Sequence, residues 1–143
     1  MRLMLLAIAA TAAFAQAPPA VGVSSSLDFQ FFKTRVQPIF LAKRPGHARC
    51  YVCHSTGTPF RLQRLSPGAT TWNDEQSHRN FEAAQREVVP GDPQASPLLI
   101  HPLAAGAGGD AFHSGGKHWD SRNSREWQAM AEWVRGQKAP ASR

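Results

Sequence analysis

The only two cysteines of the chain are Cys50 and Cys53, and His54 follows the second one directly. A disulfide between residues three apart would close a very small loop and would restrain the chain little. A redox dithiol usually stands at the start of a helix after a strand, and no βαβ pattern surrounds this pair. A structural zinc site needs about four ligands, commonly from two such pairs, and the chain has one pair.

The spacing matches C-x-x-C-H, the attachment signature of c-type haem. With this spacing on one helical turn, the distance between the two thiols matches the distance between the two vinyl groups of a porphyrin. The thiols would add to these vinyl groups. His54 would then lie under the iron as its proximal ligand. We therefore predict one covalent haem c, with Cys50 and Cys53 as its anchors and His54 as an axial ligand.

The residue on the other side of the iron would decide the function. A strong protein ligand makes an electron carrier, whereas an open position permits the binding of small molecules. His47 stands too close to Cys50 to reach the far side easily, and His78 lies in a polar helical stretch that suggests a solvated side chain. The candidates that remain are His101, His113, His118 and Met130.

The glycine-rich loop from Ala104 to Trp119 is the best place for this second ligand. Gly115 and Gly116 have no side chains, so the backbone there can lie close to a flat ring. We predict His113 as the distal ligand and iron ligand. The alternatives are His118, His101, Met130 and an open site.

The N-terminus indicates export. Arg2 precedes an apolar run from Leu3 to Phe14, and Ala13-Phe14-Ala15 offers small residues to a signal peptidase, which predicts cleavage after Ala15. The run has twelve residues, fewer than the roughly 20 that a spanning helix needs. No later stretch is long and apolar enough to span a bilayer, so we expect no membrane segment after cleavage. The expected location is periplasmic or secreted, which agrees with haem attachment outside the cytoplasm.

Cleavage would leave 128 of the 143 residues, enough for one domain with a modest core, and a formal charge of +5 instead of +6. Basic residues gather ahead of the cysteines, at Lys43, Arg44 and Arg49. They form either a solvated loop, a docking surface for an acidic partner, or a cation beside a bound anionic group. Nucleic acid is not an expected partner of an exported chain without a basic-aromatic motif.

The pattern of apolar residues predicts a small all-α fold. A first helix begins near Ser26, places Phe29, Phe32, Val36 and Phe40 on one face, and is kinked or ended near Gln37 by Pro38. Residues 57–72 read as a loop, with a short extended piece at residues 60–65. The four Trp residues are interpreted as core and haem packing.

Three further helices are predicted from their caps. A middle helix follows Asn73 and stops at Pro90-Gly91, and a short helix follows Ser96 and Pro97. The last helix follows Ser124, buries one apolar face, and ends near Gly136 and Pro140; the residues of that face are Trp127, Met130, Ala131 and Val134. The expected organisation is a signal peptide at 1–15, a flexible lead at 16–26, a haem domain at 27–138 and a tail at 139–143.

From about Phe31 to Val134 the chain resembles a single-haem cytochrome c domain of the planctomycete-type cytochrome c families. The resemblance is carried by "VQPIF" ahead of "CYVCH", by "VVPGDPQASPLL", and by "HSGGKHW" followed by "REWQAMAEWV". It implies a cytochrome c-like fold of short helices around one haem, with His113 at the position of the family's loop histidine. Common cytochromes c offer a methionine in this loop and this chain has none there, which favours two histidines.

The function expected from these observations is single-electron transfer outside the cytoplasm between redox partner proteins, with an acidic partner as one reading of the basic cluster. The protein would be a carrier or a subunit of a larger oxidoreductase and not itself an enzyme, because no acid-base pair accompanies the haem motif. The alternative is a haem-based sensor that binds a small ligand in place of a displaceable distal residue.

Overall fold

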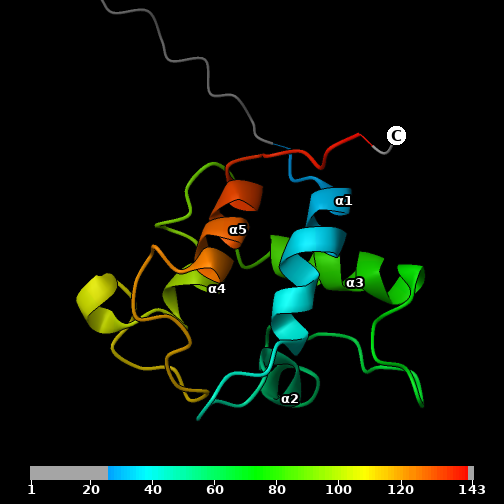
Figure 1. Cartoon of the computed structure of the whole chain (residues 1–143), viewed down its shortest axis with the longest axis horizontal. Helices are drawn as coiled ribbons and strands as arrows, with labels where there is room; N and C mark the ends of the chain where they lie inside the picture. Colours follow the sequence, from blue (N-terminus) through cyan, green and yellow to red (C-terminus); the bar gives the residue numbers. More distant parts are fainter. Residues whose placement is uncertain (1–25, 142–143) are drawn as a thin grey trace, which may run out of the picture.

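The computed structural model describes residues 26–141, a helix-rich chain in which these residues form no β-strand, as the sequence predicted (Figure 1). The signal peptide predicted at 1–15, nearly all of the lead predicted at 16–26, and residues 142–143 lie outside the described residues. None of the helices in the described part is both long and apolar enough to cross a bilayer. The helical elements are α1 (Phe29–Phe31), η1 (Phe32–Val36), η2 (Gln37–Leu41), α2 (Cys50–His54), α3 (Asp74–Gln85), α4 (Pro97–Ile100), η3 (Ala105–Ala107) and α5 (Arg125–Val134).

The first three elements form one continuous helical stretch of changing type. It begins at Phe29 and not near Ser26, because the Asp28 carboxylate caps it by accepting the Phe31 N–H at 2.7 Å. The element η1 is a π-helix, and η2, which contains Pro38, is a 3-10 helix. Proline has no N–H to donate, and here the chain changes helix type at Gln37 and continues to Leu41.

The core lies between this helical stretch and α5, which stand side by side in Figure 1. The Phe32 side chain is fully buried, and its ring centroid lies 5.2 Å from that of Trp133 and 5.4 Å from that of Phe81. All four Trp side chains are buried. The residues of the predicted α5 face are buried too, and Trp133, which the sequence pattern had not assigned to that face, is buried with them. Phe29, by contrast, is only half-buried.

The helix α3 begins as predicted and ends earlier. Asn73 accepts the Gln76 N–H at 2.9 Å while the Gln76 side chain accepts the Asn73 N–H at 3.1 Å, which completes a capping box. The helix ends at Gln85 and not at Pro90-Gly91. Just after the helix, the Glu87 carbonyl accepts the Leu98 N–H of α4 at 2.9 Å. In a longer helix this carbonyl would accept an N–H of the next turn, so the bond to α4 takes the place of a helical hydrogen bond.

A buried polar network joins α3 to the segments on either side of α2. Gln37 donates to the Ser77 hydroxyl at 3.0 Å, Asn80 donates to Gln37 at 3.3 Å, and the Asn80 oxygen accepts the Gln63 N–H at 2.7 Å. The Ser77 and Asn80 side chains are fully buried. Because buried polar groups without partners are costly, this network fixes where residues 60–65 run.

Residues 60–65 do not form a strand, although they run close to α2. The Leu62 N–H donates to the His54 carbonyl at 2.7 Å, and the Leu65 N–H donates to the Tyr51 hydroxyl at 3.1 Å. The predicted extended piece is therefore a hydrogen-bonded loop, because its partners are a helix end and side chains and no second strand is present among residues 26–141.

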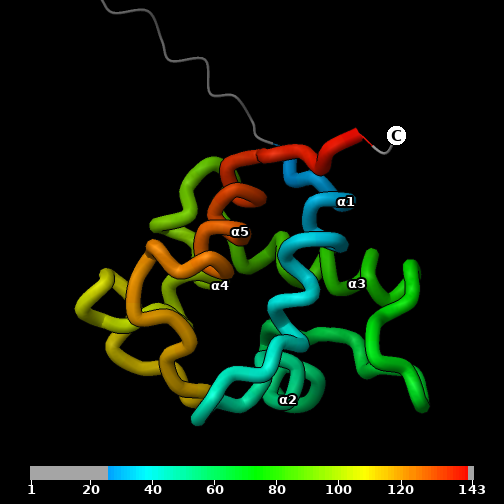
Figure 2. The backbone as a smooth tube through the Cα atoms, viewed as in Figure 1, coloured from blue at the N-terminus to red at the C-terminus, as the bar shows by residue number. Residues whose placement is uncertain are grey.

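The caps of the two later helices differ. The Ser124 hydroxyl accepts the Trp127 N–H at 3.4 Å, as predicted for α5. Ser96 stands at the N-cap position of α4, but its hydroxyl makes no capping bond. It donates to the Asp92 carbonyl at 2.7 Å and accepts the Val89 N–H at 2.9 Å, so it closes the preceding turn. Figure 2 shows that the start and the end of the described chain meet, where Lys138 bonds the Ser26 carbonyl at 2.9 Å.

Candidate functional site

One cavity, of about 310 Å³, collects the residues that the sequence singled out. Cys50, Cys53 and His54 line it from α2, which forms the helical turn that the sequence predicted, and His113 lines it from the loop between η3 and α5. The rest of its lining is mostly apolar and includes Phe40, Phe60, Leu98, Trp119 and Met130.

The His54 ring is held by groups just beyond its own helix. Its Nδ1 lies 3.0 Å from the Phe60 carbonyl and 3.0 Å from the Thr58 hydroxyl. A carbonyl can only accept, so Nδ1 carries the proton and Nε2 keeps a free lone pair. Burial lowers the pKa of His54 below its ordinary value, although the hydrogen bond to the Phe60 carbonyl opposes this shift. The imidazole is therefore neutral near pH 7.

The His113 ring is held in the same way by its own loop. Its Nδ1 donates to the Gly116 carbonyl at 2.7 Å. Gly116 has a φ of +79°, a conformation that favours glycine, and a Cβ on Gly115 would lie 3.1 Å from Cε1 of the His113 ring. The two glycines thus let the loop fold tightly around the histidine itself, and His113 also keeps a free Nε2.

The two histidines line the cavity from two different elements. Their ring centroids are 6.3 Å apart and their planes differ by 15°. This separation is too large for rings in van der Waals contact. In residues 26–141 no group of three or more His, Cys, Asp and Glu side chains is arranged to hold a metal ion.

The alternative ligands are placed less suitably. His101 lines the cavity, but its side chain is 52% exposed and is paired with the Asp110 carboxylate, and Met130 lines the cavity from within the core, where its side chain is fully buried. His47 and His78 are exposed and are not among the residues that line the cavity. The His78 ring stacks on Phe29 with centroids 3.7 Å apart, which agrees with the predicted surface position.

His118 also lines the cavity, although its ring has no contact with that of His54 among the described ring pairs. Its ring centroid lies 5.3 Å from that of His47 and 6.0 Å from that of His113. Its Nδ1 is buried without a hydrogen-bond partner in the described part of the chain. Burial, and after it the charge of Arg44, lowers the pKa of His118 to about 4, so this imidazole is neutral at pH 7.

Both cysteines are free thiols, Cys50 half-buried and Cys53 exposed. Burial raises the pKa of the Cys50 thiol, and the guanidinium of Arg44 opposes that effect by its charge and by a hydrogen bond. Cys50 is therefore a protonated thiol at neutral pH.

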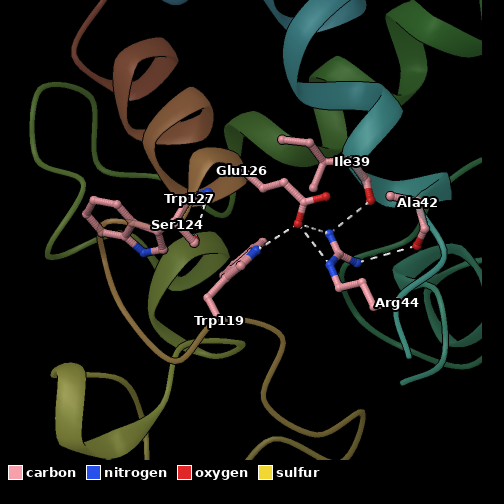
Figure 3. Close-up of polar contacts among 7 residues, drawn as sticks. All are labelled: Ile39, Ala42, Arg44, Trp119, Ser124, Glu126 and Trp127. Atoms are coloured by element: carbon pink, nitrogen blue, oxygen red, sulfur yellow. Dashed lines mark hydrogen bonds and ion pairs between the residues drawn. The ribbon is translucent and has the colours of Figure 1, made fainter. Parts of the chain in front are cut away.

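An ion pair fixes the loop ahead of α2 to α5 (Figure 3). The Arg44 guanidinium lies 2.8 Å and 2.5 Å from the Glu126 carboxylate, through Nε and Nη2. The same carboxylate accepts the Trp119 indole N–H at 3.0 Å, and the Arg44 guanidinium lies 5.8 Å from the centroid of the Trp119 ring. The Arg44 side chain is only 12% exposed, so the interpretation of the basic cluster as a solvated loop is wrong for this residue.

Sequence reasoning missed the residues that orient the predicted ligands. Thr58 and Phe60 appeared only as parts of a loop, although a hydrogen-bond acceptor for the second nitrogen is expected beside any metal-binding histidine. That expectation, applied to the few residues after His54, would have pointed to this segment. Glu126 gave no such signal, because it is 82 residues from Arg44 in the sequence.

Comparisons with protein-family models, with curated proteins and with solved structures found no match for this chain. The resemblance to a cytochrome c domain stays a prediction.

Proposed function

We propose that the protein is an extracytoplasmic c-type cytochrome that carries single electrons on one haem. Cys50 and Cys53 would bind the haem covalently, and His54 and His113 would be the axial ligands of its iron. The observation that carries the proposal is that these two imidazoles, from separate elements, line the cavity that both cysteines line, with their ring centroids 6.3 Å apart.

The separation of the rings fits one metal atom between them. A metal–nitrogen bond to histidine is about 2 Å and an imidazole nitrogen lies about 1.1 Å from the centre of its ring, which gives about 6.2 Å between two rings on opposite sides of a metal. The observed separation is 6.3 Å. Two histidines are too few to hold a metal ion by themselves, so a group that brings its own equatorial nitrogens suits this donor set.

The protonation of the two rings supports the same proposal. Both Nδ1 atoms are engaged by backbone carbonyls, those of Phe60 and Gly116, and neither Nε2 atom has a hydrogen bond within residues 26–141. Such carbonyl partners fix the ring orientation and the tautomer of metal-binding histidines. The lowered pKa of His54 agrees with this, because only the neutral imidazole can donate a lone pair to a metal.

When bound, the haem would supply a site for one-electron oxidation and reduction at its iron. The chain's own residues would hold the two axial positions, anchor the ring through the thiols, and exclude water with the apolar lining of Phe40, Phe60 and Leu98. Two filled axial positions favour electron transfer over bond-making at the iron. The proposed location outside the cytoplasm depends on the signal peptide predicted from residues 1–15.

The covalent attachment is tested by mass spectrometry of the exported protein. We expect the mass of the mature chain plus one haem, retained after denaturation, and a haem-stained band on a denaturing gel. Cys50→Ala/Cys53→Ala should lose both signals, while Val52→Ala on the same turn should keep them. Haem that stays with the double variant through denaturation would exclude these two anchors.

A haem-based sensor is the second candidate, because the polar contact that holds the His113 ring comes from its own loop. Displacement of His113 by a small ligand would then break only this local arrangement. Carbon monoxide binding to the reduced protein separates the two candidates, since a sensor binds it readily and a carrier with two fixed histidines does not.

A further inference from the structure

The planes of the two cavity histidines are nearly parallel. The ring planes of His54 and His113 differ by 15°. The torsion that turns a histidine ring about its Cβ–Cγ bond is broad, so the rotamer of the side chain does not define the plane closely. The contacts of each ring must therefore hold the two planes in this relative orientation.

The His54 ring has two polar contacts at one nitrogen. Besides the Phe60 carbonyl, the hydroxyl of Thr58 lies 3.0 Å from Nδ1. The same hydroxyl donates its proton to the Phe60 carbonyl. Because that proton is used there, the Thr58 oxygen presents a lone pair to the Nδ1–H, which is then shared between two acceptors. The three groups form a closed set of hydrogen bonds.

Two acceptors restrict the ring more than one acceptor would. A hydrogen bond tolerates moderate bending, so a ring with a single acceptor can turn over a range of angles without losing the bond. A ring whose N–H is shared must satisfy both acceptors at once, and fewer orientations do so. Thr58 is half-buried and lines the cavity, so its hydroxyl is partly protected from competing water.

The segment that carries both acceptors is itself fixed to α2. The Leu62 N–H donates to the His54 carbonyl at 2.7 Å. The side chain and the main chain of His54 are therefore bonded to the same short segment, residues 58–62. The two acceptors keep their positions relative to the helix from which the His54 ring projects.

The orientation of the rings matters for an iron held between them. Each axial imidazole interacts through its π electrons with the iron d orbital that its plane selects. Two parallel rings act on the same orbital and separate it in energy from its partner, whereas two perpendicular rings act on both orbitals alike. Hydrogen bonds to the ligands are one of the means by which a protein sets the properties of a haem iron.

We propose that Thr58 is a positioning residue, whose hydroxyl holds the imidazole plane of His54 parallel to that of His113. The inference rests on the proposed function. Thr58 acts through His54 and has no contact with the iron in this assignment. A ring held by two acceptors keeps its plane when the charge of a bound iron changes, so no rotation of this ligand accompanies the gain or loss of an electron.

Electron paramagnetic resonance of the frozen, oxidised, haem-loaded protein measures this orientation. Near-parallel rings give a low-spin signal with three resolved g values, and perpendicular rings give a broad signal with one large g value. We expect the first kind for the wild type. Thr58→Val replaces the hydroxyl by a methyl group of similar size, and it should raise the largest g value and broaden the signal, because one acceptor then holds the ring. An unchanged Thr58→Val signal would overturn the proposal.

Three further variants separate the hydroxyl from packing. Thr58→Ser keeps the hydroxyl and should give the wild-type signal, while Thr58→Ala removes it and should reproduce the shift of Thr58→Val. Thr56→Val removes a nearby hydroxyl that bonds the Cys53 carbonyl at 3.2 Å, and it should leave the signal unchanged. An equal shift in Thr58→Ser or in Thr56→Val would show that packing or the turn as a whole decides the signal, and would contradict a role of the Thr58 hydroxyl.

The signal of the wild type distinguishes failure of this inference from failure of the proposed function. A protein without haem, or with a high-spin signal, contradicts the proposed function and the inference with it. A low-spin wild type with one large g value keeps a haem with two histidines but contradicts the parallel arrangement. A low-spin wild type with three g values and an unaffected Thr58→Val contradicts only the role of Thr58.

Discussion

At the scale of single residues, the histidines of the cavity are distinguished by their hydrogen bonds. His54 and His113 each give one nitrogen to a carbonyl and keep the other free, whereas the buried Nδ1 of His118 has no partner among the described residues. A buried polar atom without a partner costs free energy, and the cost grows when the ring must also be charged. We therefore expect the protonation of His118 to make the free energy of unfolding depend on pH.

The pKa of His118 is about 4 in the folded protein, below its ordinary value near 6.5. Above that ordinary value both the folded and the unfolded chain are neutral at this residue, so His118 contributes no pH dependence. As the pH falls from about 6.5 to about 4, the unfolded chain binds a proton that the folded chain does not, and the free energy of unfolding decreases. Because the residue is partly exposed, we expect a loss of about 1 kcal/mol.

Denaturant unfolding at pH 7 and near pH 4.5 measures this effect. His118→Gln should lose part of the wild-type decrease, while His78→Gln on the surface should keep all of it. An unchanged pH dependence in His118→Gln would contradict the assignment of the effect to this ring.

At the scale of elements, the parts that could be predicted are those whose signals are local. The box of Asn73 and Gln76 and the cap at Ser124 lie within three residues of the helix starts that they define. The helical turn of Cys50–His54 follows in the same way from the spacing of its own residues. These hydrogen bonds join residues that are close in the sequence, so the sequence pattern was sufficient to predict where the helices begin.

The parts that were wrong depend on partners outside the helix that the pattern described. Ser96 has the sequence of a cap, but its hydroxyl bonds the Asp92 carbonyl and the Val89 N–H of the preceding turn. The Glu87 carbonyl just after α3 accepts an N–H from α4, and Arg44 is paired with Glu126, 82 residues away. The last two pairings form only when the elements pack, so the sequence pattern does not contain them.

The ion pair of Arg44 and Glu126 joins the loop ahead of α2 to α5, and we expect it to contribute to the free energy of unfolding. Arg44→Met leaves the Glu126 carboxylate without its cation, and we expect it to lower the free energy of unfolding by about 2 kcal/mol, less than for a fully buried pair because Glu126 is 33% exposed. Glu126→Gln should cost a similar amount.

A double-mutant cycle measured by denaturant unfolding is the check. Arg44→Met/Glu126→Gln should be more stable than the sum of the single losses predicts, because no charge is left unpaired. Arg79→Met on α3, which breaks an exposed pair with Glu75, serves as a control and should cost about 0.5 kcal/mol or less. Additive losses at Arg44 and Glu126 would contradict a coupled pair.

At the scale of the whole molecule, a cavity adjoins a small core. The helical stretch 29–41 and α5 supply most of the buried rings, while α2, α4 and the loop before α5 contribute to the lining of the cavity. A protein of this size has a limited core of its own, and an apolar group that filled the cavity would add buried surface.

Loss of the haem should therefore lower stability. We expect the haem-free form of Cys50→Ser/Cys53→Ser to have a free energy of unfolding about 3 kcal/mol or more below that of the loaded wild type, because the cavity lining would lose its apolar contacts. The wild-type chain produced without haem attachment is the matched control and should resemble the double variant. Equal unfolding midpoints for the loaded and haem-free proteins would contradict a haem in this cavity.

The central claim is that one iron lies between His54 and His113. The most direct measurement is the absorption spectrum of the reduced, haem-loaded protein with and without carbon monoxide, for the wild type, His113→Ala and His118→Ala. We predict a low-spin wild type that carbon monoxide leaves unchanged, the same behaviour in His118→Ala, and a high-spin spectrum with carbon monoxide binding in His113→Ala. A wild type that binds carbon monoxide readily, or a His113→Ala protein that stays low spin, would contradict the claim.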